Sequence, residues 1–137
     1  MLKTHYIEKK LKPESDMVDI TPDLEEIVKK ESLKEALLFL SSIGSTAAIT
    51  TAEFESGLIK DLKETFAKLF PFKKDYSHNN TWADDNAHSH LRSSFLKTNF
   101  FVSITNGKLD LGTWQQVILI NFDTKIRSRK IAVKVLN

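Results

Sequence analysis

The order of apolar and polar residues along the chain predicts a sheet protein with a few helices. Positions 3–11 place Tyr6 and Ile7 among charged residues and predict a strand, and positions 17–20 predict a second short strand after a polar turn at 13–16. Further strands are predicted at 36–40, 100–104, 108–111, 114–122 and 129–136.

Three of these segments support more detailed expectations. The run 36–40 is apolar at every position, so we expect a strand that is covered on both faces and continues through the small residues at 44–51. The Asn-Gly pair at 106–107 predicts a tight hairpin turn. Residues 114–122 are apolar on both alternating faces, which predicts a central strand with Trp114 packed inside the protein.

Helical spacing appears in three places. Thr21 and Pro22 are typical of a helix start, the first as a cap and the second as a first-turn proline, and they predict a helix over 22–31. Its inner residues would be Leu24, Ile27 and Val28. The clearest helix is predicted at 56–70, and a shorter one begins near residue 86. The inner side of that shorter helix would be Leu91, Phe95 and Leu96.

Together these elements predict one domain over residues 1–137 with an α+β fold, in which a mixed or antiparallel β-sheet sandwich carries two or three helices. Composition then excludes several classes of function. With 20 Lys+Arg, 18 Asp+Glu and a net charge of +2, the chain lacks the charge excess that polyphosphate binding needs, so no nucleic-acid partner is predicted. The absence of cysteine excludes disulfides, thiolate metal sites and cysteine nucleophiles.

The hydropathy of the chain bears on whether the protein is expected in a membrane, outside the cell or in the cytoplasm. No segment reaches the roughly 18 consecutive apolar residues of a membrane helix. The first residues also lack the apolar core of a signal peptide. We therefore expect a cytoplasmic protein that does not act in a membrane.

Three of the four histidines form the first candidate site. His78, His88 and His90 lie within 13 residues, close to Asp84 and Asp85. Neutral imidazole with carboxylate is a typical ligand set for a divalent metal such as zinc. On an ideal helix, however, residues two apart point about 200° apart, so His88 and His90 converge only if His88 precedes the regular helix. The alternative is that His88 caps or packs and His90 lines a helix end.

Two arginines form the second candidate site. Arg127 and Arg129 are two apart in a predicted strand and would project from the same face, where their guanidinium groups could bind an anion such as phosphate. Thr113 and Gln115 could add neutral donors. The alternative is a solvated hairpin end paired with Asp123.

Two acidic residues are candidates for catalysis. Glu53 follows the hydroxyl-rich segment and Asp61 lies on the predicted helix 56–70. Carboxylates at these positions could hold a divalent cation, zinc or magnesium. The alternative for Glu53 is a helix cap, and for Asp61 a solvated surface position.

Three ordered blocks of sequence resemble one known family. Residues 107–115 read Gly-Lys-Leu-Asp-Leu-Gly-Thr-Trp-Gln, with Asp123 and an Arg-Ser-Arg run behind them, and look like the C-terminal signature of the YjbQ family. The segment 78–91 resembles the histidine segment of that family, and 45–53 resembles its hydroxyl-rich strand. The resemblance covers nearly the whole chain from residue 19 onward.

This resemblance implies an α+β protein that assembles as a homotrimer, in a family whose members often have no known function. It also implies a weak thiamine-phosphate synthase activity, a transfer that joins a pyrimidine methyl diphosphate to a thiazole phosphate and releases pyrophosphate. Binding of a phosphorylated small molecule follows from the same resemblance. The alternative is a non-enzymatic ligand-binding or regulatory trimer that uses the same pocket.

Departures from the family pattern favour that alternative. Gly44 stands where the family usually has histidine, Ala52 where it commonly has asparagine, and Asn121 where it commonly has glutamate. Each change removes a group that acid–base or metal chemistry would use.

Overall fold

The structure is a computed structural model that describes residues 2–137. Its strands are β1 (Lys3–Leu11), β2 (Asp16–Asp19), β3 (Ala36–Ser42), β4 (Ala47–Ala52), β5 (Asn99–Thr105), β6 (Lys108–Leu109), β7 (Gln116–Asn121) and β8 (Arg127–Leu136). Its helices are α1 (Thr21–Lys30), α2 (Ser56–Leu69), α3 (Asn79–Trp82) and α4 (Ala87–Leu96). The α+β prediction is confirmed, and the described residues contain four helices instead of two or three because Asn79–Trp82 forms a further single turn.

The strands form two antiparallel sheets. One has five strands in the order β1-β8-β3-β5-β6, and the other has three in the order β2-β7-β4. Every pairing between these strands is antiparallel. Strand β7 is central in its sheet, as predicted, and residues 117–121 within it are buried.

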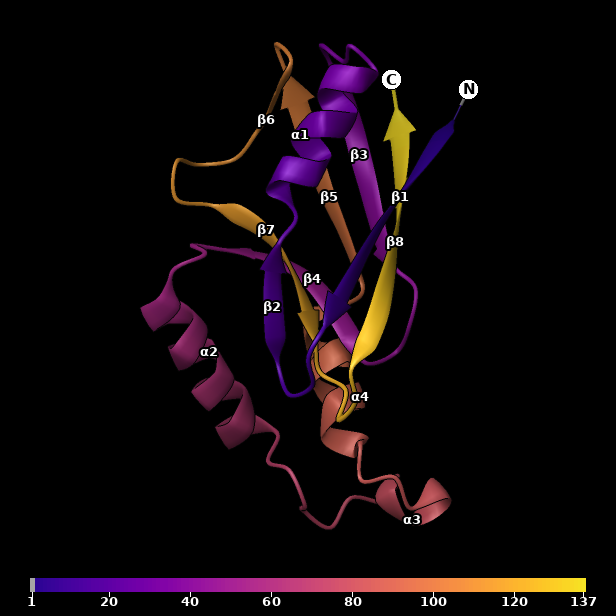
Figure 1. Cartoon of the computed structure of the whole chain (residues 1–137), viewed down its shortest axis with the longest axis vertical. Coiled ribbons are helices and arrows are strands. Elements are labelled where there is room, and N and C mark those ends of the chain that lie inside the picture. Colours follow the sequence, from indigo (N-terminus) through magenta and orange to yellow (C-terminus); the bar gives the residue numbers. More distant parts are fainter. Residues whose placement is uncertain (1) are drawn as a thin grey trace.

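The sheets and helices form layers with two hydrophobic cores. The larger core fills the space between the two sheets and includes the inner residues of α1, which are Leu24, Ile27 and Val28 as predicted. The smaller core lies on the other side of the three-stranded sheet, where Phe66 of α2 packs edge to face on Phe122 with ring centroids 5.0 Å apart. Figure 1 shows α1 toward the upper end of the molecule and α2 and α4 toward the lower end.

Strand β3 differs from its prediction. Leu38 and Leu40 are buried in the larger core, but Leu37 and Phe39 point to the outer face of the five-stranded sheet and are only partly buried. The expectation of a strand covered on both faces is therefore wrong. The following segment does not continue β3 either, because the chain crosses at residues 43–46 and forms β4 in the other sheet.

Helix α1 begins one residue earlier than expected. Thr21 belongs to the helix, and Ile20 is the residue before its first turn. The Thr21 hydroxyl accepts a hydrogen bond from the backbone N–H of Val117 at 2.9 Å, so it ties α1 to β7 instead of capping the helix. No helix among residues 2–137 is long and apolar enough to cross a membrane.

Candidate functional site: a buried arginine and its aspartate

A polar cluster lies where β7 ends and β8 begins. It consists of Thr46, Asn121, Asp123, Arg127 and Arg129, and we call it the Asp123 cluster. Asn121 is the last residue of β7, Arg127 is the first of β8, and Thr46 precedes β4, which pairs with β7. All except Arg127 are buried, so the polar atoms must find partners among themselves.

Arg129 is held by three neutral acceptors. Its Nε and Nη2 atoms donate to Oδ1 of Asn121 at 3.1 and 2.6 Å. Nη2 also donates to the backbone carbonyl of Thr46 at 3.0 Å and to its hydroxyl at 2.7 Å. Burial lowers the pKa of Arg129 from its ordinary value, and the carboxylate of Asp123, 4.0 Å away, opposes this shift. The side chain is therefore fixed in place while it keeps its charge.

Asp123 is shared between the two arginines. Its Oδ2 accepts a hydrogen bond from Nε of Arg127 at 2.9 Å and one from the Thr46 hydroxyl at 3.0 Å. Burial alone would raise the pKa of Asp123, but these hydrogen bonds and the charges of Arg127 and Arg129 hold it below its ordinary value. The pairing of Arg127 with Asp123, which was the alternative to an anion-binding role, is present, and both arginines turn toward this one carboxylate as their spacing predicts.

Backbone contacts explain why the cluster forms here. Nδ2 of Asn121 donates to the carbonyls of Lys12 and Lys125, at 2.7 and 3.1 Å, so it joins the β1–β2 turn to the β7–β8 turn. Asp123 donates its backbone N–H to Oδ1 of Asn121 at 3.2 Å. In β8, inward-facing positions alternate, which puts Arg129 on the same inner face as Ile131.

The missing side chain of Gly44 makes room for Nη1 of Arg129. A Cβ atom at Gly44 would lie 2.9 Å from Nη1 of Arg129, closer than real carbon atoms approach. Within residues 2–137, the hydrogen bonds of Arg129 use Nε and Nη2. Nη1 is therefore a donor directed at a position without a side chain.

A cavity of about 520 Å³ opens beside Gly44. Ser45, His90 and Lys97 are among the residues that line it. Burial lowers the pKa of His90 below its ordinary value of 6.5, and the neighbouring His78 lowers it further, while the charges of Asp84 and Asp123 oppose the shift. His90 is therefore mainly neutral near pH 7 and can both donate and accept a proton.

The three histidines that were predicted to bind metal do not all meet. The rings of His78 and His90 pack against each other with centroids 4.7 Å apart. His88 instead packs edge to face on Phe72, at 4.9 Å, and is fully buried. Both His88 and His90 lie within the regular helix α4, where residues two apart face different sides.

Of the three histidines, the structure brings His78 and His90 together and places His88 apart from them. Among residues 2–137, no group of three or more His, Asp or Glu side chains is placed to hold a metal ion. Metal ligation by His78, His88 and His90 stays a prediction, because the structure brings together only the first and the third of them. The polar groups that the structure gathers at the site are the guanidinium groups of Arg127 and Arg129 and the imidazole of His90.

Sequence reasoning missed a second buried charged group on α4. Nε2 of His88 lies 3.4 Å from a carboxylate oxygen of Glu14, and Nη1 of Arg92 lies 3.8 Å from the same oxygen. Arg92 also donates to the carbonyl of Phe70 at 2.8 Å and to the hydroxyl of Ser15 at 3.3 Å. Burial lowers the pKa of both His88 and Arg92.

This group corrects the predicted inner face of α4. Phe95 was expected on the inner side of the helix, but its side chain is 72% exposed. The buried face is largely polar and consists of Ala87, His88, Ser89, Arg92 and Ser93. A search for periodic apolar residues cannot reveal a buried face that is polar. The available signal was the four-residue spacing of His88 and Arg92, which puts both side chains on the same side of a helix.

Thr113 and Gln115 do not lie with the arginines. They precede β7, whereas Arg127 and Arg129 follow it, so the two pairs are at opposite ends of one strand. Nε2 of Gln115 donates to the hydroxyl of Thr51 at 3.1 Å, and its Oε1 accepts from the backbone N–H of Gly112 at 3.0 Å. The prediction that Trp114 packs inside is wrong, because it is 73% exposed on this loop.

Glu53 and Asp61 are both exposed. Glu53 lies in the connection between β4 and α2, next to Phe54, whose N–H donates to the side chain of Gln116 at the start of β7. Asp61 is on α2. The cap of α2 is Glu55, which accepts from the N–H groups of residues 57 and 58 at 2.7 and 2.9 Å. Neither candidate carboxylate reaches the Asp123 cluster.

Fold and sequence comparisons place this architecture in a class of small α+β proteins. A crystal structure from Sulfolobus solfataricus, described as a YbjQ-like protein of unknown function, superposes with a TM-score of 0.89 at 32% identity and covers 100% of this chain and 99% of its own. A hypothetical protein from Aeropyrum pernix gives a TM-score of 0.91 at 27% identity, with 98% of each chain covered.

Sequence similarity agrees with the fold. The sequence profile of one family, described as UPF0047 protein YjbQ-like, matches residues 5–137. A UPF0047 protein of Archaeoglobus fulgidus is 35% identical over 121 residues, which are 88% of this chain and 91% of the relative. UPF0047 protein YugU of Bacillus subtilis is 28% identical over 99% of both chains. The chain belongs to the YjbQ (UPF0047) family, as its three sequence blocks predicted.

Proposed function

We propose that this protein binds a phosphorylated small molecule at the open side of the Asp123 cluster, with Arg127 and Arg129 as its phosphate contacts. One observation carries the proposal. Arg129 is fixed by Asn121 and Thr46 and is only 6% exposed, while its Nη1 lies beside Gly44 and makes no hydrogen bond within residues 2–137. A guanidinium that is already ordered loses little entropy when it binds an anion.

The charge of the cluster supports an anionic ligand. Two guanidinium groups share the single carboxylate of Asp123, and the other partners of Arg129 are neutral. One positive charge is therefore left without a counter-charge inside the cluster. The Arg127 side chain is 46% exposed, so its remaining N–H groups can reach a ligand from solvent.

Binding, without catalysis, is the function that this geometry supports. A thiamine-phosphate synthase-like transfer would need carboxylates near the diphosphate, or a metal held by them. Glu53 and Asp61, which were predicted to supply these carboxylates, are on the β4–α2 connection and on α2. The non-enzymatic ligand-binding alternative is therefore the one we adopt.

Assembly of several copies is the second part of the proposal. The outer face of the five-stranded sheet carries exposed aromatic residues, with Tyr6 58% and Phe101 55% exposed. Phe39 packs on Phe101 with ring centroids 4.7 Å apart, and Lys130 lies 4.3 Å above the Tyr6 ring. Such faces on soluble proteins are often covered by another chain. Light scattering should give the mass of a homotrimer, and a mass of 15.6 kDa would contradict this part.

Isothermal calorimetry with inorganic pyrophosphate tests the binding proposal. We expect saturable binding to the wild type and about tenfold weaker binding to Arg127→Gln, because one charged hydrogen-bonding contact is lost. Lys125→Gln is the matched control, since it removes the same charge from the same exposed turn. Equal losses in the two variants, or no binding to the wild type, would overturn the proposal.

A complementation test distinguishes the ligand-binding hypothesis from the enzyme hypothesis. A strain that cannot make thiamine phosphate should not grow when this protein is expressed at a high level. Growth that depends on Arg127 would show that the cluster takes part in a transfer reaction, and the non-enzymatic part of the proposal would then be wrong.

A further inference from the structure

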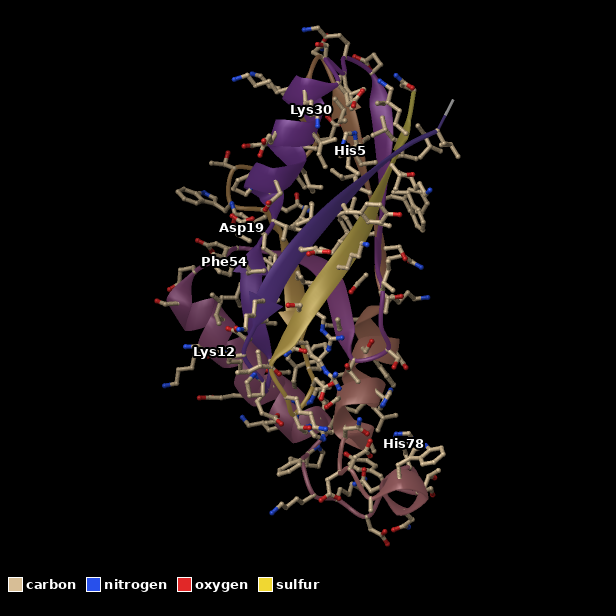
Figure 2. All side chains as sticks on the ribbon, turned by 45° about the vertical axis from the view of Figure 1, so that its right-hand side comes forward. His5, Lys12, Asp19, Lys30, Phe54 and His78 are labelled. Atoms are coloured by element: carbon tan, nitrogen blue, oxygen red, sulfur yellow. The ribbon has the colours of Figure 1, made fainter. Side chains whose placement is uncertain are left out.

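A second and larger cavity lies at the other end of the molecule. It measures about 730 Å³ and is bounded by one side of α1 and the α1–β3 connection, by the β5–β6 hairpin, and by the segment 111–116, which ends at the first residue of β7. The two cavities share no lining residue. Figure 2 shows Lys30, which follows the lining residue Lys29, toward the upper end of the molecule, and His78, which packs on the lining residue His90, at the lower end. Nothing in the proposed function uses this upper cavity.

Hydrogen bonds fix one wall of the cavity. The turn between β5 and β6 is attached to the α1–β3 connection, because Gly107 donates its N–H to the carbonyl of Lys34 at 3.0 Å. The N–H of Asn106 donates to a carboxylate oxygen of Glu35 at 2.8 Å. Gly107 has φ of +77°, and a Cβ there would lie 3.4 Å from the Leu33 carbonyl, so glycine permits this close approach.

The opposite wall is fixed in the same way. Gln115 closes the turn from Gly112 through its backbone N–H, which donates to the Gly112 carbonyl at 3.0 Å. Its side chain then anchors that turn to Thr51 of β4. Thr21 links the start of α1 to Val117 of β7. The cavity therefore exists before any ligand enters, as is typical of small-molecule sites.

The lining is apolar at its floor and cationic at its rim. Val28 and Leu33 are buried, and Leu109 and Leu111 pack against them. The rim carries three exposed lysines, Lys29, Lys34 and Lys108. Among residues 2–137 the ion pairs that lysines form involve Lys3, Lys9 and Lys60, so the rim ammonium groups have no carboxylate partner.

We propose that this cavity binds a small amphipathic anion. The apolar body of the ligand lies on the leucine and valine floor, and its carboxylate or phosphate group faces the rim lysines. Glu25 is the one acidic side chain among the lining residues within the described part of the chain, so the net charge of the lining is positive and excludes a cationic ligand. Within the described residues the N–H groups of Leu111, Gly112 and Gln115 already donate inside their own turn, so Thr113 is the residue of this turn that adds a neutral donor beside the rim.

NMR titration tests this site with three probes that share an eight-carbon chain. Octanoate and octyl phosphate carry the two candidate anionic groups, and octanol is the neutral control. We expect both anions to shift the backbone amide signals of Gly107 and Gly112 in a saturable way, and octanol to bind at least about tenfold more weakly. A stronger effect of one anion identifies which headgroup the rim prefers.

Reversing the charge of two rim lysines tests whether the anions bind in this cavity. In Lys34→Glu/Lys108→Glu, both anions should bind about tenfold more weakly, because two attractive contacts become repulsive. The control Lys10→Glu/Lys63→Glu changes the net charge equally at exposed positions on β1 and α2, and it should bind like the wild type. Arg127→Gln should also bind both probes normally, which separates this site from the proposed function.

Three results would overturn the proposal. These are octanol binding as tightly as octanoate, shifts confined to residues outside the cavity, and equal losses in the two charge-reversal variants. Loss of probe binding in Arg127→Gln would show that the anions bind at the Asp123 cluster instead.

Discussion

The guanidinium group of Arg129 donates two hydrogen bonds to a single oxygen, Oδ1 of Asn121, with distances of 3.1 Å from Nε and 2.6 Å from Nη2. A neutral amide thus orients a buried cation without cancelling its charge. A carboxylate at the same position would satisfy the same donors and neutralise the cluster. The amide therefore favours a site that receives its negative charge from a ligand.

Replacing Asn121 with alanine should destabilise the fold. The change leaves the buried guanidinium of Arg129 without its main acceptor. It also removes the hydrogen-bond donor of the backbone carbonyls of Lys12 and Lys125. We expect the free energy of unfolding in urea to fall by about 3 kcal/mol. Asn80→Ala, at an exposed position on α3, should change it by less than about 0.5 kcal/mol. Similar losses in both variants would contradict the role given to Asn121.

Gly44→Ala should affect both stability and binding. Gly44 has φ of +149°, and the added Cβ would meet Nη1 of Arg129 at 2.9 Å. We expect a loss of about 1–3 kcal/mol in the free energy of unfolding, and weaker binding of pyrophosphate because the new methyl group covers the donor. In Gly112→Ala the nearest contacts would be 3.7 Å or more, so both quantities should stay near their wild-type values. Unchanged pyrophosphate affinity in Gly44→Ala would argue against Nη1 as a ligand contact.

Stability should fall as the pH drops below 6.5. Burial lowers the pKa of His88 and of His90 in the folded protein below the ordinary value of 6.5. Between the lowered values and 6.5 the unfolded chain binds more protons than the folded one, so acid favours unfolding. For fully buried His88 the loss is at most about 1.4 kcal/mol per pH unit. Urea denaturation at pH 7.5, 6.5 and 5.5 measures how the free energy of unfolding changes with pH.

The variant His88→Asn should make this pH dependence shallower, because it removes one of the two groups that gain a proton on unfolding. The comparison uses the slope of stability against pH, so a constant loss of stability from the substitution does not affect it. A free energy of unfolding that rises between pH 6.5 and 5.5 would contradict the account of both histidines.

The cap of α2 gives a further prediction. Glu55 accepts hydrogen bonds from the N–H groups of Gly57 and Leu58, and the first of these holds its pKa below the ordinary value. Glu55→Ala should lower the free energy of unfolding measurably, as is usual for a lost helix cap. Glu53→Ala should leave it nearly unchanged, since the Glu53 side chain is exposed two residues before the cap. An equal or larger effect at Glu53 would show that the earlier glutamate is the functional cap.

Most of the fold could be predicted because local patterns and tertiary structure agree. The alternating Ile131, Val133 and Val135 of β8 are buried as expected, and this alternation also placed Arg127 and Arg129 on one face. The prediction that strand β3 is covered on both faces was wrong because apolar residues occupy both faces, although one of them lies on the outside of the sheet. A pattern of hydrophobicity cannot distinguish a face covered by the core from one left exposed.

The candidate site was harder to predict because it joins segments far apart in the sequence. The Asp123–Arg127 pair is local, but Thr46 reaches it only through the pairing of β4 with β7. Thr113 and Gln115 are close to the arginines in sequence, yet β7 separates them in space. For the histidines, local sequence was sufficient, because helical spacing alone indicated that His88 and His90 face different sides of the helix.

The most direct test of the account follows the guanidinium nitrogen atoms of Arg129 by NMR during a titration with inorganic pyrophosphate at constant ionic strength. We predict that the signal of Nη1 shifts in a saturable way, that Nη2 shifts little because it stays bound to Asn121 and Thr46, and that Arg129→Lys abolishes the binding. Saturable pyrophosphate binding with no change at the Arg129 side chain would contradict the central claim that this fixed arginine is the anion contact.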